Sequence, residues 1–94
     1  MRGDENKFDG GKHMWDLLPI QSMEDIVDIL TYGANKYEPN GWMKVKDAKR
    51  RYIAAFFRHF MAWLKGEKID PESGKPHLAH ALTNLVFINE LEGK

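Results

Sequence analysis

The stretch DAKRRYIAAFFRHFMAWLKGEKIDPESGKPHLAHALTNLVFINEL, residues 47–91, predicts two helices joined by a polar turn. Its apolar residues recur every three or four positions, which is the spacing of a buried helical face. Asp47 is a good N-cap, Gly66 suits the position after a helix, and Pro76 suits a first helical turn. We therefore expect antiparallel helices over residues 47–65 and 76–91. The apolar positions are Ile53, Phe56, Phe60, Trp63 and Leu64, then Leu78, Leu82, Leu85, Val86, Phe87 and Leu91.

A third helix is expected before them, over residues 21–36, with Ser22 and Asp25 as a capping box. Its buried stripe would consist of Met23, Ile26, Val27, Leu30 and Ala34. The preceding WDLLP, residues 15–19, is an expected apolar anchor. No segment alternates with the two-residue period of a strand, so the sequence predicts an all-α antiparallel bundle of three main helices. Residues 1–14 are expected to form an extended arm, and residues 15–94 a single helical nucleotide-binding domain.

Length and charge limit the function. A chain of 94 residues buries a thin core, which oligomerisation often completes. Lys and Arg number 14, as do Asp and Glu, so no basic excess is available to follow an extended nucleic acid. A small phosphorylated ligand needs only a few local cations and stays possible. The chain has no cysteine, no apolar run of about 18 residues and no signal-peptide core, which predicts a cytoplasmic protein without thiolate zinc sites or membrane spans.

A group of imidazoles and acids surrounds the turn between the last two helices. His77 and His80 are three residues apart, as are Glu67 and Asp70 in the turn. Antiparallel packing would bring His59 opposite them. Such a pocket suits a divalent cation, Mg²⁺ or Mn²⁺. The plainer alternative is that the histidines are ordinary packed residues and the acids only solvate the turn.

Other polar residues are candidates for binding a nucleotide. Lys36 can hold a phosphate, and Tyr37 or Trp42 can stack on a base. Arg58 interrupts an apolar run, so we expect it to be buried with a carboxylate or phosphate partner. The remaining candidates are Lys12 in the arm, Asn40 in the NG turn, and Asn84 on the face of His77 and His80. Glu24 is a further candidate, one turn from Asp28: the two carboxylates either share a cation or line the solvent face of their helix.

Three stretches, taken in order, resemble one known family. They are KFDGGKHMWDLLP (7–19), LTYGANKY (30–37) and RHFMAWLKGEKIDPESGKPHLAHALTN (58–84). Together they resemble the phage-type dATP/dGTP diphosphohydrolases, a branch of the MazG-like all-α nucleotide pyrophosphohydrolases. The last stretch is long and specific, and the resemblance covers about residues 7–92.

The resemblance implies a helical dimer or tetramer that hydrolyses a purine deoxynucleoside triphosphate to its monophosphate and pyrophosphate with Mg²⁺ or Mn²⁺. The broader superfamily holds its metals with Glu-Glu-x-x-Glu on one helix and Glu-x-x-Asp on the next. This chain lacks the first motif and carries His77-Leu-Ala-His80 where the second is expected, while Glu67 and Asp70 repeat its spacing in a turn. The ligand set therefore does not carry over directly.

The leading hypothesis is metal-dependent hydrolysis at the α-phosphate, in which Glu67, Asp70 or Glu24 takes the proton of the attacking water. His59, Glu67, Asp70, His77 and His80 are the candidate metal ligands. In a host cell, a phage-encoded enzyme would act in the cytoplasm. Three alternatives stay open: a phage protein that sequesters a cyclic signalling nucleotide, a histidine-rich phosphohydrolase acting on monophosphates, and a helical bundle without a ligand.

Overall fold

The structure is a computed structural model that describes residues 10–93. Three α-helices dominate it: α2 (Ile20–Lys36), α3 (Ala48–Leu64) and α4 (His77–Gly93). Short 3-10 turns, η2 (Trp15–Leu17) and η3 (Gly41–Lys44), precede α2 and α3. Within residues 10–93 the only β-type pairing is a single bridge between Ile69 and Pro76, so the prediction of an all-α bundle of three main helices is confirmed.

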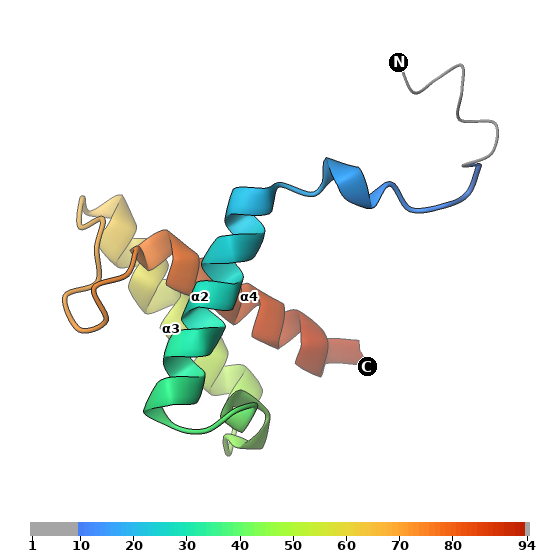
Figure 1. The fold of residues 1–94 in the computed structure, drawn as a ribbon. Coiled ribbons are helices and arrows are strands. Elements are labelled where there is room, and N and C mark those ends of the chain that lie inside the picture. The colour runs from blue at the N-terminus through green and yellow to red at the C-terminus, as the bar shows by residue number, and fades with distance from the viewer. Residues whose placement is uncertain (1–9, 94) are drawn as a thin grey trace.

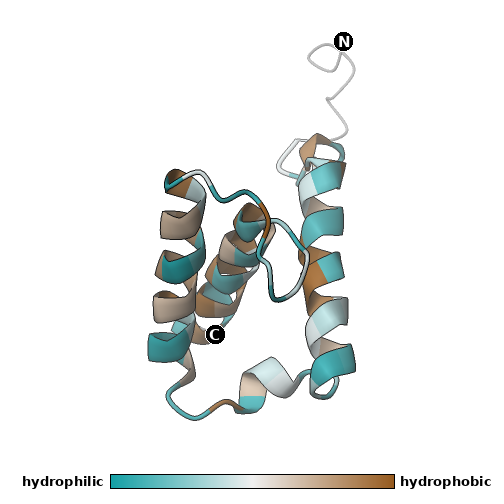
Figure 2. Cartoon of the chain, turned by 90° about the vertical axis from the view of Figure 1, so that its left-hand side faces the viewer, coloured by the Kyte–Doolittle hydropathy of each residue, from teal (hydrophilic) through white to brown (hydrophobic). Residues whose placement is uncertain are grey.

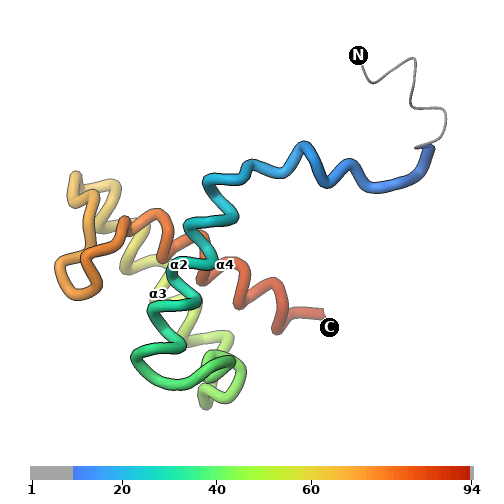
Figure 3. Tube along the Cα trace, in the orientation of Figure 1, coloured from blue at the N-terminus to red at the C-terminus, as the bar shows by residue number. Residues whose placement is uncertain are grey.

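Helices α3 and α4 form the main antiparallel pair, and α2 crosses over them (Figure 1). An ion pair joins Lys49, near the start of α3, to Glu92, near the end of α4, at 3.1 Å. At the other end of the pair, the ring of His59 lies against that of His77. The first turns of α4 are therefore next to the second half of α3, where the sequence placed them. The trace of residues 10–19 leads away from the helices (Figure 3), whereas residues 1–9 of the expected arm lie outside the described residues.

The helix limits agree closely with the sequence, but their caps differ. Helix α2 begins at Ile20 with Pro19 as its N-cap and has no side-chain cap bond, so the capping box predicted at Ser22 and Asp25 is wrong. Asp47 does occupy the N-cap of α3. It adopts a left-handed backbone conformation there, with φ of 55°, and its side chain makes no capping hydrogen bond.

The face that α4 turns inward is polar. His77, His80, Thr83 and Asn84 are buried there beside two alanines, and Thr83 has no exposed surface. Their polar groups are satisfied locally: Thr83 donates to the carbonyl of Ala79, and Asn84 donates to that of His80. Burying hydrogen-bonded polar groups in this way avoids the cost of unpaired ones. The centre of this bundle is thus a polar cluster flanked by small side chains.

Many large apolar side chains lie outside that centre, contrary to the predicted stripes. In Figure 2, apolar and polar residues alternate along each helix. In α2 the buried residue is Ile29, while Met23 and Val27 are exposed. Exposed apolar residues elsewhere include Trp15, Leu17 and Leu18 of the expected anchor, Ile53, Phe57, Met61, Trp63 and Leu64 of α3, and Leu78 and Leu85 of α4. The interior of a single copy is therefore too small to bury its apolar side chains, because three short helices enclose only a narrow space.

Candidate functional site

The loop between α3 and α4 is folded tightly enough to place two acids beside three imidazoles. Gly66 and Gly74 have φ values of 101° and 75°, a left-handed conformation that glycine adopts without strain. The backbone N–H of Asp70 donates to the carbonyl of Lys75, and that of His77 donates to the carbonyl of Lys68. These bonds close the loop onto the first turn of α4.

One chain of short hydrogen bonds links the loop to α3. His77 Nε2 lies 2.7 Å from Glu67 Oε1, and its other ring nitrogen, Nδ1, lies 2.8 Å from His59 Nδ1. The His77 side chain is buried, whereas half of the Glu67 side chain is exposed, at 53%. This chain of hydrogen bonds therefore runs from the interior of the helix pair to the solvent.

A second chain reaches the third imidazole. The Ser73 hydroxyl donates to Asp70 Oδ2 at 2.9 Å, and Ser73 Oγ lies 2.7 Å from His80 Nε2. The backbone N–H groups of Glu72 and Ser73 also donate to the Asp70 carboxylate. The ring of His80 stacks on that of His59, with centroids 4.3 Å apart and planes 8° apart, so the two chains meet face to face.

The cluster shifts the proton affinity of its members. Burial, together with the neighbouring His80, lowers the pKa of His59 to about 4, against a raising effect of Asp70. Burial also lowers the pKa of His80, although Asp70 opposes this. For Asp70, burial would raise the pKa, but the hydrogen bonds from Ser73 and from the Glu72 and Ser73 backbone outweigh it and the pKa is lowered. At neutral pH the stacked rings are thus neutral beside an ionised carboxylate.

The arrangement does not match a resident metal site. Residues 10–93 contain no group of three or more His, Asp or Glu side chains placed to hold one ion. Both ring nitrogens of His77 face partners in the hydrogen-bond chain, and His80 Nε2 faces Ser73. A shared ion needs several lone pairs aimed at one point, whereas these groups point at each other. We therefore assign no metal ligand within the cluster.

The other predicted residues are scattered. Lys36 lies near the loop, because its ammonium group pairs with Glu72 at 3.0 Å. That hydrogen bond, with a smaller effect of Tyr37, holds the pKa of Lys36 above its usual range. Trp42 stacks on Phe87 at 4.5 Å, so one face of its ring is already occupied. Asn84 is buried and bonded within α4, as described above.

Three candidates lie apart from the cluster. Glu24, Lys12 and Asn40 are exposed, and within the described part of the chain no hydrogen bond or ion pair joins any of them to the cluster. Asn40 instead shapes the turn before η3, where its φ is 61°.

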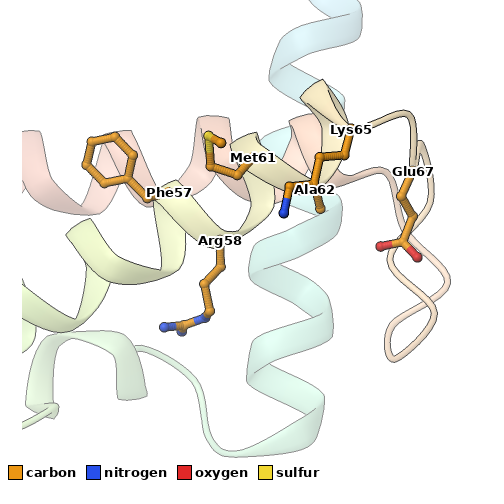
Figure 4. Close-up of a pocket in the computed structure, with 6 residues that line it drawn as sticks. All are labelled: Phe57, Arg58, Met61, Ala62, Lys65 and Glu67. Carbon is orange, nitrogen blue, oxygen red and sulfur yellow. The ribbon is translucent and has the colours of Figure 1, made fainter.

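Arg58 lies at the surface, so the expectation that it is buried is wrong, whereas its pairing with a phosphate stays a prediction. It points away from Phe57 and Met61 in Figure 4 and borders a depression of about 630 Å³. The lining residues are Phe57, Arg58, Met61, Ala62, Lys65 and Glu67. Arg58 also borders a second depression of about 320 Å³ that contains Arg50 and Arg51. Glu67 connects the first depression to the cluster, because the same carboxylate bonds His77.

Sequence reasoning missed Ser73, Glu72 and Lys75. The stretch PESG, residues 71–74, has the composition of an ordinary turn. Nothing in it indicates a contact between Ser73 and His80, seven residues later. The spacing of Ser73 three residues after Asp70 was the available signal, because a short hydroxyl in a turn commonly bonds a nearby acid. Lys75 forms an ion pair with Asp28 of α2 at 3.1 Å, which no local pattern indicates.

The fold and the cluster define a small all-α chain with acids and imidazoles converging beside surface cations. Comparison with known proteins identifies it further. The family model described as "dATP/dGTP diphosphohydrolase, N-terminal" matches residues 2–94. The chain belongs to this family.

A "dATP/dGTP diphosphohydrolase" of Salmonella phage PMBT28 is 34% identical over 82 residues. The match covers 87% of this chain and 28% of that protein, so the chain spans under a third of its relative. No solved structure matches the chain. No helix of the described residues is long and apolar enough to cross a membrane.

Proposed function

We propose that this chain hydrolyses purine deoxynucleoside triphosphates to the monophosphate and pyrophosphate. The observation that supports this most directly is the convergence of Glu67, Asp70 and three imidazoles next to a depression bordered by Arg58 and Lys65. Hydrolysis of a triphosphate needs cations beside the phosphates and a proton acceptor beside the attacking water. Both are available here within one short helix–loop–helix. The name of the relative supports the substrate class.

The cations on either side of the cluster would bind the polyphosphate. Arg58 and Lys65 line the depression that Glu67 also borders, and Lys36 reaches the same loop through Glu72. Arg58 can pair with phosphate oxygens through two N–H groups, whereas Lys36 acts as a point charge. Phe57, exposed on the depression, offers a face for a purine ring, and Tyr37 is an exposed alternative.

We propose that the divalent cation, Mg²⁺ or Mn²⁺, arrives with the triphosphate as part of the substrate. This agrees with the donor set described above, in which the acids and imidazoles bond each other. The ion would neutralise phosphate charge when bound.

We also propose that the chain works as a homo-oligomer, a dimer or tetramer. The exposed stripe of Ile53, Phe57, Met61 and Leu64 on α3 supports this, because an apolar stripe of this length on a helix is usually covered. Phe57 and Met61 belong to both the stripe and the depression, so the depression lies at the edge of the proposed interface between copies.

The experiment is incubation of the purified chain with each of the four deoxynucleoside triphosphates, with Mg²⁺, Mn²⁺ or EDTA. Products are separated by ion-exchange chromatography and pyrophosphate is measured separately. Release of purine monophosphate and pyrophosphate, abolished by EDTA, is expected. Recovery of intact nucleotide after denaturation of a stable complex would instead indicate a protein that sequesters nucleotides. Free inorganic phosphate without pyrophosphate would contradict cleavage at the α-phosphate.

A further inference from the structure

The hydrogen bonds through His77 have only one arrangement when the two rings are neutral. The ionised carboxylate of Glu67 can only accept, so His77 Nε2 must carry the proton of that 2.7 Å bond. His77 Nδ1 is then a lone pair and accepts from His59 Nδ1–H across 2.8 Å. His59 Nε2 is consequently left without a proton. The acid at one end of the chain thus determines the tautomer at the other.

The bare nitrogen of His59 reaches solvent. In the described part of the chain, every buried side-chain nitrogen or oxygen has a hydrogen-bond partner. His59 Nε2 has no partner among the described residues, because the ring bonds His77 through Nδ1. The nitrogen must therefore have accessible surface. The stacked ring of His80 holds the imidazole plane in place from one side, and its neutrality follows from burial.

We propose that Glu67, His77 and His59 form a proton relay in which His59 Nε2 is the general base that takes a proton from the attacking water. This role rests on the hydrolysis proposed above. It assigns the general base to an imidazole, whereas the sequence analysis assigned it to a carboxylate.

The proton balance is simple. Water gives a proton to His59 Nε2, and the resulting hydroxide attacks the α-phosphorus. The bond from that phosphorus to the bridging oxygen breaks, and pyrophosphate leaves with the electron pair. His59 Nδ1–H passes its proton to His77 Nδ1, and His77 Nε2–H passes its proton to Glu67. At this point the two rings are in the opposite tautomers and Glu67 is protonated. The transfers then run in reverse: Glu67 returns its proton to His77 Nε2, and His77 Nδ1 returns its proton to His59 Nδ1. His59 Nε2 gives its proton to the departing pyrophosphate or to bulk water, and the resting tautomers return.

His59 is the catalytic residue in this scheme, and His77 and Glu67 are positioning residues. The scheme predicts a tautomer pattern that packing alone would not require. His59 should be the Nδ1–H form, which is the less common one for a free imidazole, and His77 the Nε2–H form.

The first test reads these tautomers by ¹⁵N nuclear magnetic resonance of the imidazoles at pH 7.5, with no nucleotide present. Wild type should show His59 with a bare Nε2. In Glu67→Gln, the amide can donate to His77 Nε2, so the pattern should reverse or become mixed. Glu90→Gln is the matched control, because Glu90 is an exposed acid of α4 and the change removes the same charge. A wild-type His59 protonated at Nε2 would overturn the relay.

The second test separates kcat from KM. Glu67→Gln should lower kcat at least about tenfold with little change in KM, and His59→Gln should lower it about 10²- to 10⁴-fold. Melting temperatures establish that both variants are folded. An unchanged kcat in His59→Gln would refute its role as the base. Absence of hydrolysis by wild type would remove the proposed function and the base role together, whereas the tautomer measurement decides the hydrogen-bond relay independently of activity.

Discussion

Acidification below about pH 6.5 should destabilise this protein through His59. The pKa of His59 is about 4 in the fold, against an ordinary value of 6.5. The His59 ring therefore becomes protonated near pH 6.5 in the unfolded chain, but only near pH 4 in the folded chain. A lowered histidine pKa gives stability that is present above pH 6.5 and is lost progressively as the pH falls to 4.

The magnitude follows from the shift. Between pH 7 and pH 5 a shift of this size corresponds to a loss of about 2 kcal/mol. The ring is only half-buried, so solvent screening reduces the expected loss to about 1 kcal/mol. For a chain of this length that is a fall in Tm of about 4–8 °C. The lowered pKa of His80 acts in the same direction, whereas the lowered pKa of Asp70 matters only at still lower pH.

The assay is urea unfolding, followed by circular dichroism, at half-unit steps from pH 7.5 to pH 4.5. His59→Gln is the comparison, because glutamine does not titrate and can still bond His77. The variant should lose about 1 kcal/mol less than wild type over this range. Parallel curves for the two proteins would refute the assignment of the lowered pKa to His59.

Three further changes test other parts of the structure. Tyr52→Phe removes the 2.6 Å bond to the carbonyl of Trp42 and should cost about 1 kcal/mol in urea unfolding, whereas Tyr37→Phe at an exposed ring should cost almost nothing. Met61→Glu places a charge in the exposed stripe of α3 and should convert an oligomer into monomer by light scattering; an unchanged mass would contradict that interface. Ser73→Ala removes the hydroxyl between Asp70 and His80 and should lower stability by about 1–2 kcal/mol, with equal urea midpoints for variant and wild type as the contrary result.

The sequence by itself determined the helices and their order. Apolar residues spaced for a 3.6-residue period, with Gly66 and Pro76 at boundaries, specify local structure that needs no distant contact. The family was also recognisable from the motif between residues 58 and 84, because that motif is contiguous. Both kinds of information are local in the chain.

Only the tertiary structure decided which side of each helix is buried. Periodicity predicts that an apolar face exists, but the rotation of a helix depends on its neighbours. The polar residues of α4 took the interior because they satisfy each other and the loop, which left Met23, Phe57 and Met61 outside.

The site divides in the same way. Spacing indicated that His77 and His80 share a face and that His59 opposes them. The bond between His59 and His77, the stacking of His59 on His80 and the insertion of Ser73 depend on the packing of α3 against a closed loop. Residue types left open whether the histidines are metal ligands or ordinary packed residues. Hydrogen-bond direction, a property of three-dimensional geometry, supports the proposed proton relay, because a lone pair that accepts an N–H or O–H group is not available to an ion.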